Sequence, residues 1–300
     1  QNARNVEGSS STLFQLLIPP EADVFLRQSS QLLLEVDETT AVLPWEILDL
    51  PERDRPADAR PWAITTQLVR KFRTAQFRQQ PRDATAEDQI LVVGEPLCDA
   101  NYPPLPGALA EARSVADIFR KKLPRGVVHS ERQGPRDVLN ALNARPYRVV
   151  HVAGHGEPGA QGGVVLEGGT FLGPQEIRAL RVVPEFVFVN CCHLAAGDLS
   201  AGLGNPAVFA SNVAQSLIAI GVRCVVAAGW AVEDEPARIF AEKLYATLLD
   251  GGTFADAVGR AREAARLRSP TGSTWAAYQC YGDPHWRLRS STGDDDEPFV

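Results

Sequence analysis

The sequence predicts an α/β protein whose mainly parallel sheet is covered by helices on both faces. Apolar runs of strand length alternate along the chain with segments whose apolar residues recur at helical spacing. The strand-like runs are continuously apolar, as strands buried on both faces of a parallel sheet are. A hydrophobic share of 44% and a charged share of 22% over 300 residues are typical of a globular chain of one or two domains.

The first part of the chain is the least regular. Residues 1–12 are polar and serine-rich, which predicts a linker. The apolar segment Leu13–Ile18 ends at two prolines, and Gln31–Val36 is expected to form a strand. The apolar segment Leu43–Leu48 is expected to pack on the main body of the protein.

A change in composition marks an internal boundary. Residues 51–82 are rich in proline and in Lys and Arg, which predicts an irregular connection with one strand near Ile64–Val69. We therefore assign residues 13–85 to an N-terminal extension subdomain and residues 86–290 to the core of the protein. The basic stretch is better explained as a solvated surface than as a partner-binding site.

From residue 86 onward, strands and helices alternate regularly. The acidic residues 291–300 predict a disordered tail. The expected strands are Gln89–Gly94, Gly126–His129, Arg148–Ala153, Phe186–Asn190 and Cys224–Ala228. The expected helices are Leu109–Phe119, Pro135–Asn143, Asn212–Ile220, Glu235–Leu249 and Thr253–Leu267.

Composition excludes several classes of protein. A net charge of −7 argues against a nucleic-acid binder, and no apolar run is long enough to predict a membrane span. Five cysteines, two of them adjacent, do not suggest a disulfide scaffold, so a reducing compartment such as the cytoplasm is expected. Because the chain lacks methionine and a recognisable leader, we expect it to be a piece of a longer protein.

A histidine and a cysteine pair stand at the ends of two expected strands. His155, which lies between two glycines, follows Arg148–Ala153, and Cys191-Cys192 follows Phe186–Asn190. Functional sites of parallel sheets lie at the carboxyl ends of the strands, and one crossover can join these two strands as neighbours. The sequence thus brings an imidazole and a thiol to one edge of the sheet, as nucleophilic cysteine catalysis requires.

Other chemistries are poorly supported. Cys191, Cys192 and His193 are adjacent, and no second pair of cysteines has the spacing of a structural zinc site. The first core strand is followed by Gly-Glu-Pro instead of a glycine-rich nucleotide loop, and the chain contains no G-x-S-x-G elbow. We therefore expect no metal and no cofactor. His151 is expected to be a buried structural residue, and Cys98, Cys224 and Cys280 core residues.

Several segments resemble the CHAT domain, a caspase-like module related to separase and the metacaspases. Two of them carry the histidine and the cysteines: H-V-A-G-H-G at His151–Gly156 and F-V-F-V-N-C-C-H at Phe186–His193. The others are L-L-I-P-P at Leu16–Pro20, A-V-L-P-W-E-I-L at Ala41–Leu48, L-P-G-A-L-A-E-A at Leu105–Ala112, V-V-A-A-G-W-A-V-E-D at Val225–Asp234 and T-W-A-A-Y-Q-C-Y-G-D-P at Thr274–Pro284. This resemblance implies a caspase-like sheet.

The resemblance also implies a role for each site residue. His155 matches the general base and Cys192 the nucleophile, because N-C-C aligns with the family's frequent N-A-C and places Cys191 at the alanine. The backbone N–H groups of Gly156 and Cys192 match the oxyanion donors. In caspase-like folds a backbone carbonyl can orient the imidazole, so no third carboxylate is needed.

For the substrate side chain on the acyl side of the cleaved bond, the resemblance gives conflicting indications. Metacaspases that cut after Arg or Lys carry an acid two residues before the nucleophile, where this chain has neutral Asn190. The segment from Trp230 to Asp234 is similar to the W-x-V-x-D of separase, which cuts after arginine. We expect Asp234 to bind arginine beside a wall formed by Trp230, although Asp234 could instead cap the helix that follows.

The sequence therefore predicts a cysteine endopeptidase. Its expected partners are a protein substrate and a regulatory or sensor domain of the same parent protein or complex, in a bacterial and possibly antiviral setting, with no nucleic acid and no membrane. Two alternatives stay open: a catalytically silent CHAT-like interaction module, and another thiol hydrolase such as a deamidase.

Overall fold

The described structure consists of a central sheet with helices on its two faces. The computed structural model describes residues 2–22, 26, 29–49, 60–73, 82–85, 87–123, 125–157, 163–173, 176, 179–193 and 206–288. The strands on the main path of the sheet are, in spatial order, β1 (Leu33–Val36), β2 (Val69–Phe72), β12 (Tyr278–Gly282), β11 (Cys224–Ala228), β10 (Phe186–His193), β6 (Tyr147–Glu157), β4 (Gln89–Gly94) and β5 (Val127–Glu131).

Along this path the sheet is parallel except at one pairing, between β11 and β12. At the end of β6, a hairpin of β7 (Gly163–Leu166) and β8 (Thr170–Leu172) pairs with Gly156 and Glu157. A separate pair is formed by β3 (Arg82–Asp83) and β9 (Val182–Val183). The expected α/β class and mainly parallel sheet are confirmed.

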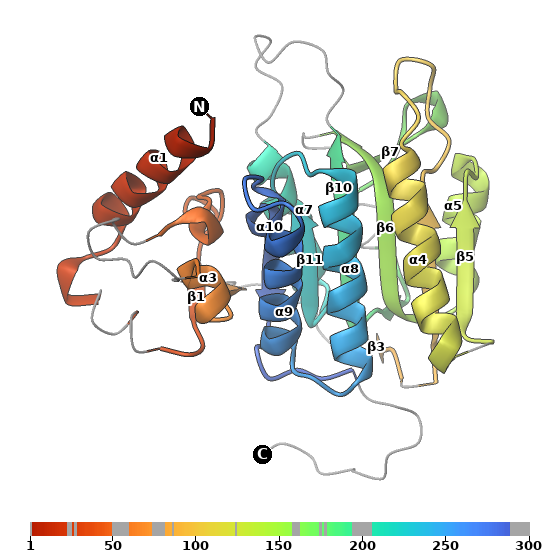
Figure 1. Ribbon diagram of the computed structural model, residues 1–300. Helices are drawn as coiled ribbons and strands as arrows, with labels where there is room; N and C mark the ends of the chain where they lie inside the picture. The colour runs from red at the N-terminus through yellow and green to blue at the C-terminus, as the bar shows by residue number, and fades with distance from the viewer. Residues whose placement is uncertain are drawn as a thin grey trace.

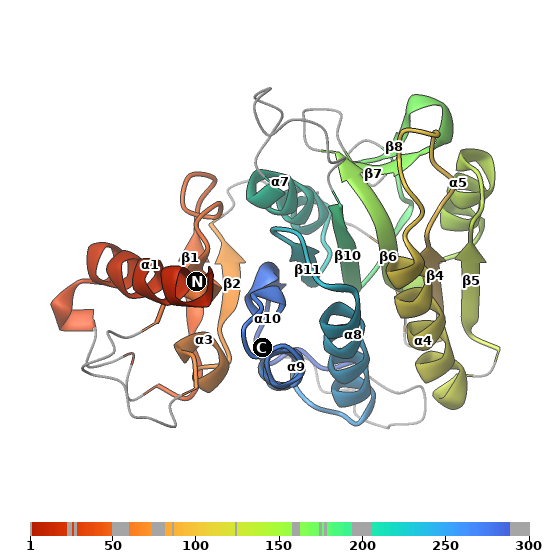
Figure 2. The same cartoon turned by 45° about the horizontal axis from the view of Figure 1, so that its top comes forward.

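Helices cover the two faces of the sheet (Figures 1 and 2). One face carries α4 (Pro106–Lys122), α8 (Asp234–Leu249) and α9 (Phe254–Arg268); the other carries α5 (Pro135–Ala144) and α7 (Pro206–Ala219). The short elements are α3 (Trp62–Thr65), α10 (Thr274–Ala277) and two 3-10 turns, η1 (Trp45–Ile47) and η3 (Glu167–Gly169). No helix in the described residues is long and apolar enough to cross a membrane.

Strand alternation sends the side chains of β10 to opposite faces. Phe186 and Phe188 pack against Tyr245 of α8, at ring-centroid distances of 5.7 and 6.0 Å. Val187 and Val189, between and after them, face a cavity that Phe209 of α7 also lines. This two-sided burial explains why the strand is continuously apolar, since each fully buried side chain of this size contributes about 1.5–3 kcal/mol.

The N-terminal part is joined to the same sheet. The helix α1 (Asn2–Leu17) precedes β1, and β1 lies beside β2 (Figure 2). The strand β2 in turn pairs with β12, at the edge of the core. Residues 2–12, which were expected to form a linker, belong to α1 and are helical. The expected strand near Ile64–Val69 is also wrong in position, because residues 62–65 form α3 and the strand begins only at Val69.

The core elements agree closely with expectation. The strands β4 and β11 have the predicted bounds, whereas β6 and β10 run further, through His155 and Cys192. The antiparallel strand β12 was not predicted. The acidic tail of residues 291–300 and most of the basic stretch, residues 51–59 and 74–81, lie outside the described residues.

Candidate active site

His155 lies beside the backbone that carries the two cysteines. The strands β6 and β10 are parallel neighbours, and the Cα of His155 is paired with that of His193, the residue after Cys192. A register shift separates this pair from the regular pairing that ends at Asn190. The described structure thus brings the backbones of His155 and Cys192 together, while the side chain of Cys192 lies outside it.

The imidazole of His155 is held by a loop that precedes α4. Its side chain is buried, and its Nε2 lies 2.7 Å from the carbonyl oxygen of Pro103. A carbonyl oxygen only accepts hydrogen bonds, so Nε2 carries the proton and, in the neutral ring, Nδ1 carries the lone pair. The sequence pattern does not identify Pro103, since a backbone carbonyl leaves no signature in residue type.

Tyr102, next to Pro103, packs on the same imidazole. The two ring centroids are 5.1 Å apart, and the Tyr102 hydroxyl donates a hydrogen bond to Glu157. Burial first, and then Glu157, raise the pKa of Tyr102, so the phenol stays a donor. Tyr102 was not predicted either, because only the folded chain places it on the histidine.

The glycines around His155 are required by close contacts. A Cβ atom at Gly156 would lie 2.7 Å from the carbonyl oxygen of Cys191 and 2.9 Å from the Cβ of Cys191. At Gly154, a Cβ would lie 3.0 Å from the ring of Pro96. Neither glycine has a positive φ. Gly156 therefore lets β10 approach the strand of the histidine, and Gly154 lets Pro96 approach it, so these glycines are needed for space and not for backbone flexibility.

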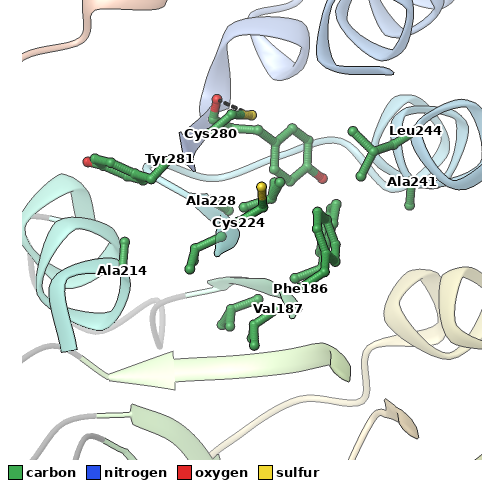
Figure 3. Close-up of a cluster of buried hydrophobic side chains, with 14 of the residues drawn as sticks. Phe186, Val187, Ala214, Cys224, Ala228, Ala241, Leu244, Cys280 and Tyr281 are labelled. Atoms are coloured by element: carbon green, nitrogen blue, oxygen red, sulfur yellow. Dashed lines mark hydrogen bonds between the residues drawn. The ribbon is translucent and has the colours of Figure 1, made fainter. Parts of the chain in front are cut away.

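Cys191 and the remaining described cysteines are core residues, apart from Cys98. Cys191 is 2% exposed, and Cys224 and Cys280 lie among the apolar side chains of β11 and β12 (Figure 3). Burial raises the pKa of Cys280 to about 12 and that of Cys224 well above its ordinary value. Cys98, expected in the core, is only half-buried, and burial followed by neighbouring carboxylates raises its pKa to about 11. These raised pKa values keep the three thiols protonated and unreactive.

A small pocket lies between α4, α8 and the ends of β6 and β10, and its lining includes Gly154, the residue before His155. It contains Asn190 and Asp234, two of the predicted substrate-binding residues. Trp230 does not line it; its indole N–H donates to the Ser273 hydroxyl over 3.2 Å. The described lining consists of Leu105, Gly107, Ala108, Glu111, Gly154, Asn190, Val232, Asp234 and Ala237.

Asp234 starts α8 and lies over the first turn of α4. The N-cap of α8 is Glu233, whose side chain makes no capping hydrogen bond, so Asp234 is not the N-cap residue. A Cβ atom at Gly107 would lie 2.1–2.5 Å from the atoms of the Asp234 carboxyl group. Glycine at this position therefore makes room for the carboxylate at the mouth of the pocket.

Asn190 holds a second acid in the pocket, one that sequence reasoning missed. Its Nδ2 donates to Oε2 of Glu111 over 2.8 Å. Glu111 lies within the segment L-P-G-A-L-A-E-A, which was noted only for its resemblance to CHAT sequences. In the described part of the chain, no three His, Cys, Asp or Glu side chains are grouped as a metal site would require.

Known proteins share this fold. The structure is similar to separase from Saccharomyces cerevisiae in its securin complex, with a TM-score of 0.50 and 18% identity, over 84% of this chain and 15% of the separase chain. It is also similar to the Arg-specific cysteine proteinase gingipain R, with a TM-score of 0.52 and 12% identity, over 96% of this chain and 69% of the other. The complex of the RgpB pro- and mature domains from Porphyromonas gingivalis matches at a TM-score of 0.53 and 12% identity, with coverages of 96% and 70%.

This chain thus corresponds to a small part of separase and to about two thirds of gingipain. No curated protein matches the sequence. The family model of the CHAT domain matches residues 7–283, nearly the whole chain. With a caspase-like sheet, a histidine and cysteines at the ends of neighbouring strands, and this match, the chain belongs to the CHAT domain family.

Proposed function

We propose that this chain is the catalytic domain of a cysteine endopeptidase that uses a dyad of Cys192 and His155. One observation carries the proposal: His155 is oriented by the Pro103 carbonyl and stands on the strand next to the one that bears Cys192. The lone pair on Nδ1 is then the base available to a neighbouring thiol. The caspase-like fold, shared with two cysteine proteinases, supports the same reaction class.

The proposed reaction proceeds in two halves. Nδ1 of His155 takes the proton from Sγ of Cys192, and the thiolate attacks the carbonyl carbon of the peptide bond. The backbone N–H groups of Gly156 and Cys192 then donate to the oxyanion, an interaction worth about 3 kcal/mol per donor in other enzymes. The C–N bond breaks as His155 returns the proton to the leaving amine, which leaves an acyl-enzyme. Water, with His155 as base, attacks this thioester and releases the acid and the thiol.

Two features favour Cys192 over Cys191 as the nucleophile. Cys191 is buried in the core, and its carbonyl and Cβ are packed against Gly156. Adjacent residues of a strand point to opposite faces, so both thiols cannot face one imidazole. We therefore assign the reactive thiol to Cys192.

We further propose that Asp234 binds a basic side chain, arginine, on the acyl side of the cleaved bond. Its support is the position of Asp234 in the lining of the pocket that also contains Asn190 and Gly154, the residue before His155. Trp230 does not line this pocket, so we propose it only as a support for the segment that leads to Asp234.

A regulatory domain of the parent protein is the partner that we propose. Separase is found in complex with securin, and RgpB in complex with its pro-domain. We propose that a fused domain or bound protein controls access to the site here, within a reducing compartment such as the bacterial cytoplasm. The four described cysteines are free thiols, which supports that environment.

The dyad is tested with a fluorogenic peptide library and a peptide electrophile that alkylates reactive thiols. Cys192→Ala and His155→Ala are expected to lower peptide cleavage by at least about 10³-fold, as removal of a nucleophile or its base does. Cys191→Ala, the matched control, is expected to retain most of the activity. Mass spectrometry of the alkylated protein is expected to locate the label on Cys192.

Three outcomes would contradict parts of the proposal. Loss of activity in Cys191→Ala with full activity in Cys192→Ala would show that the alignment is shifted by one residue. Absence of both cleavage and labelling in the intact parent protein would favour the interaction module. Release of ammonia from a glutamine side chain without peptide cleavage would favour a deamidase.

A further inference from the structure

Glu111 is a buried acid whose hydrogen bonding is incomplete. Its side chain is 1% exposed and contributes to the lining of the pocket that also contains Gly154 and Asn190. Asn190 donates to Oε2, but Oε1 accepts no hydrogen bond in the described structure. Nε2 of His151 lies 3.3 Å from Oε1, which is an ion-pair distance when the imidazole is protonated, but the contact lacks hydrogen-bond geometry. Burying a carboxylate with an oxygen that accepts no hydrogen bond is unfavourable in free energy. A cation that donated a hydrogen bond to Oε1 would therefore be bound strongly.

A row of buried side chains holds Glu111 in place. Asn190 lies on one side of it, and His151 on the other, with Nδ1 of His151 3.1 Å from the hydroxyl of Tyr245. All four side chains are buried. Burial first, and then the negative charge of Glu111, raise the pKa of Tyr245 well above its ordinary value. Because Asn190 is a neutral amide, it orients the carboxylate without neutralising it.

Asp234 adds a second acid at the mouth of the same pocket. The two neighbouring acids already have partners. Glu233 accepts a hydrogen bond from the Ser269 hydroxyl, and Glu235 forms an ion pair with Arg268. Asp234 forms no ion pair within the described residues, and lies over Gly107 at the start of α4. Among the nine residues of the described lining, two are acidic and none is basic.

We propose that Glu111 is the residue that selects a cationic substrate side chain, with its carboxylate at the closed end of the pocket and Asp234 at the mouth. This inference rests on the proposed peptidase function. A guanidinium has enough N–H donors to bind both carboxylates, which favours arginine over lysine. Leu105 and Val232 offer apolar walls to its methylene groups, and the small residues Gly107, Ala108 and Ala237 leave the pocket open.

A direct binding measurement tests this role without catalysis. The full chain carrying Cys192→Ala is titrated with Nα-acetyl-arginine amide and with Nα-acetyl-citrulline amide, which has the same shape and no charge, and binding is followed by NMR shifts or calorimetry. The arginine compound is expected to bind at least about tenfold more tightly, the effect of one charge-assisted hydrogen bond. Adding Glu111→Gln is expected to abolish this difference, and Asp234→Asn to reduce it less.

The matched control is Glu235→Gln, which makes the same change of charge on an exposed residue next to Asp234. It is expected to leave the difference intact. If Glu111→Gln does not fold, as judged by circular dichroism, Ala108→Leu is used instead; it fills the pocket and leaves Glu111 in place. Ala108→Leu is then expected to weaken the arginine compound by at least about tenfold through steric exclusion.

Equal binding of the two amides to the Cys192→Ala protein would overturn the proposal, as would an unchanged preference in Glu111→Gln. The result is separable from the peptidase assignment. A protein that binds arginine through Glu111 but cleaves no peptide would refute the peptidase function alone. A protein that cleaves through Cys192 after leucine as readily as after arginine would refute the role of Glu111 alone.

Discussion

At the scale of single residues, the environment of His155 depends on the loop before α4 and on the end of its own strand, β6. Pro103 supplies a carbonyl, Tyr102 packs its ring on the imidazole, and Glu157 accepts the hydrogen bond of Tyr102. Glu157 is only two residues beyond His155, so Tyr102 links the loop before α4 to the end of β6. Tyr102 is therefore a positioning residue for the imidazole.

This role predicts graded effects of two Tyr102 substitutions. Tyr102→Phe keeps the ring and loses the hydrogen bond to Glu157, whereas Tyr102→Ala loses both. We expect kcat to fall by about threefold to tenfold in Tyr102→Phe and by about 10²-fold in Tyr102→Ala. The reason is that a general base must stay within hydrogen-bonding reach of the proton that it removes. The measurements are kcat and KM for each variant, because a change in positioning lowers kcat while a loss of folded protein lowers only the amount of active enzyme.

Tyr147→Phe is the matched control for these variants. Its hydroxyl donates to the Ala141 carbonyl over 2.7 Å, far along β6 from His155. Its kcat and KM are expected to equal those of the unsubstituted protein. A Tyr102→Ala protein with unchanged kcat would show that the imidazole does not need the ring of Tyr102 for its position.

At the scale of elements, the start of α9 shows how a local sequence signal fixes a helix end. Thr253 and Asp256 form a capping box, in which the Thr253 hydroxyl accepts from the Asp256 N–H over 3.2 Å. Gln67, from the N-terminal part of the chain, donates to the same Asp256 carboxylate over 3.1 Å. The cap thus stabilises both the helix and its contact with the N-terminal part.

This cap makes part of the stability dependent on pH. Burial by itself would raise the pKa of Asp256, but the hydrogen bonds from Thr253 and Gln67 outweigh it and lower the pKa below 3.8. Its contribution to stability is therefore present above pH 3.8 and is lost as the pH falls through the lowered value. Asp256→Asn is expected to cost about 1 kcal/mol at pH 7 and less at acidic pH.

Urea unfolding from neutral pH down to about pH 3 measures this effect. Asp117→Asn, which changes an exposed carboxylate on α4, serves as the comparison and is expected to cost less than about 0.5 kcal/mol at every pH. An Asp256→Asn protein as sensitive to acid as the unsubstituted protein would contradict the assignment.

At the scale of the whole molecule, a buried charge cluster joins the N-terminal part to the core. Nε of Arg70, on β2, donates to Glu46 over 2.8 Å, and Arg262, on α9, donates to the Leu68 carbonyl over 2.6 Å and lies 3.4 Å from Glu46. All three side chains are 0% exposed. Burial alone would lower the pKa of Arg70, but Glu46 and Tyr281 raise it above its ordinary value. The carboxylate of Glu46 is therefore the counter-charge of both buried arginines.

Removal of that carboxylate is expected to destabilise the whole fold. Glu46→Gln leaves two buried guanidinium groups without a counter-charge, which is expected to cost about 3–5 kcal/mol. Glu35→Gln, which breaks the exposed pair of Glu35 and Arg73, is expected to cost less than about 1 kcal/mol. Denaturant unfolding of both variants checks the prediction, and equal costs would contradict it. A single transition is expected, because β2 belongs to the same sheet as the core.

The sequence by itself determined the elements of the core and the two strands that carry the site. The buried strands are continuously apolar, and in the helices apolar residues recur with a period of 3.6 residues. The bounds of β4 and β11 could therefore be predicted from this pattern alone. The pairing of β6 with β10 was expected because one crossover can join neighbouring parallel strands, and the structure confirms it. This placed the histidine beside the cysteines without any knowledge of contacts.

The tertiary structure decided which other groups surround that pair. The Pro103 carbonyl, the ring of Tyr102 and the carboxylate of Glu111 come from the loop and helix after β4, and residue type does not reveal that they converge. The structure also shows that Trp230 does not line the pocket and that residues 2–12 are helical. The periodicity of apolar residues indicates which side of a helix or strand is buried. Contacts between segments that are distant in the sequence depend on how the helices and strands pack, and this packing is a property of the whole chain.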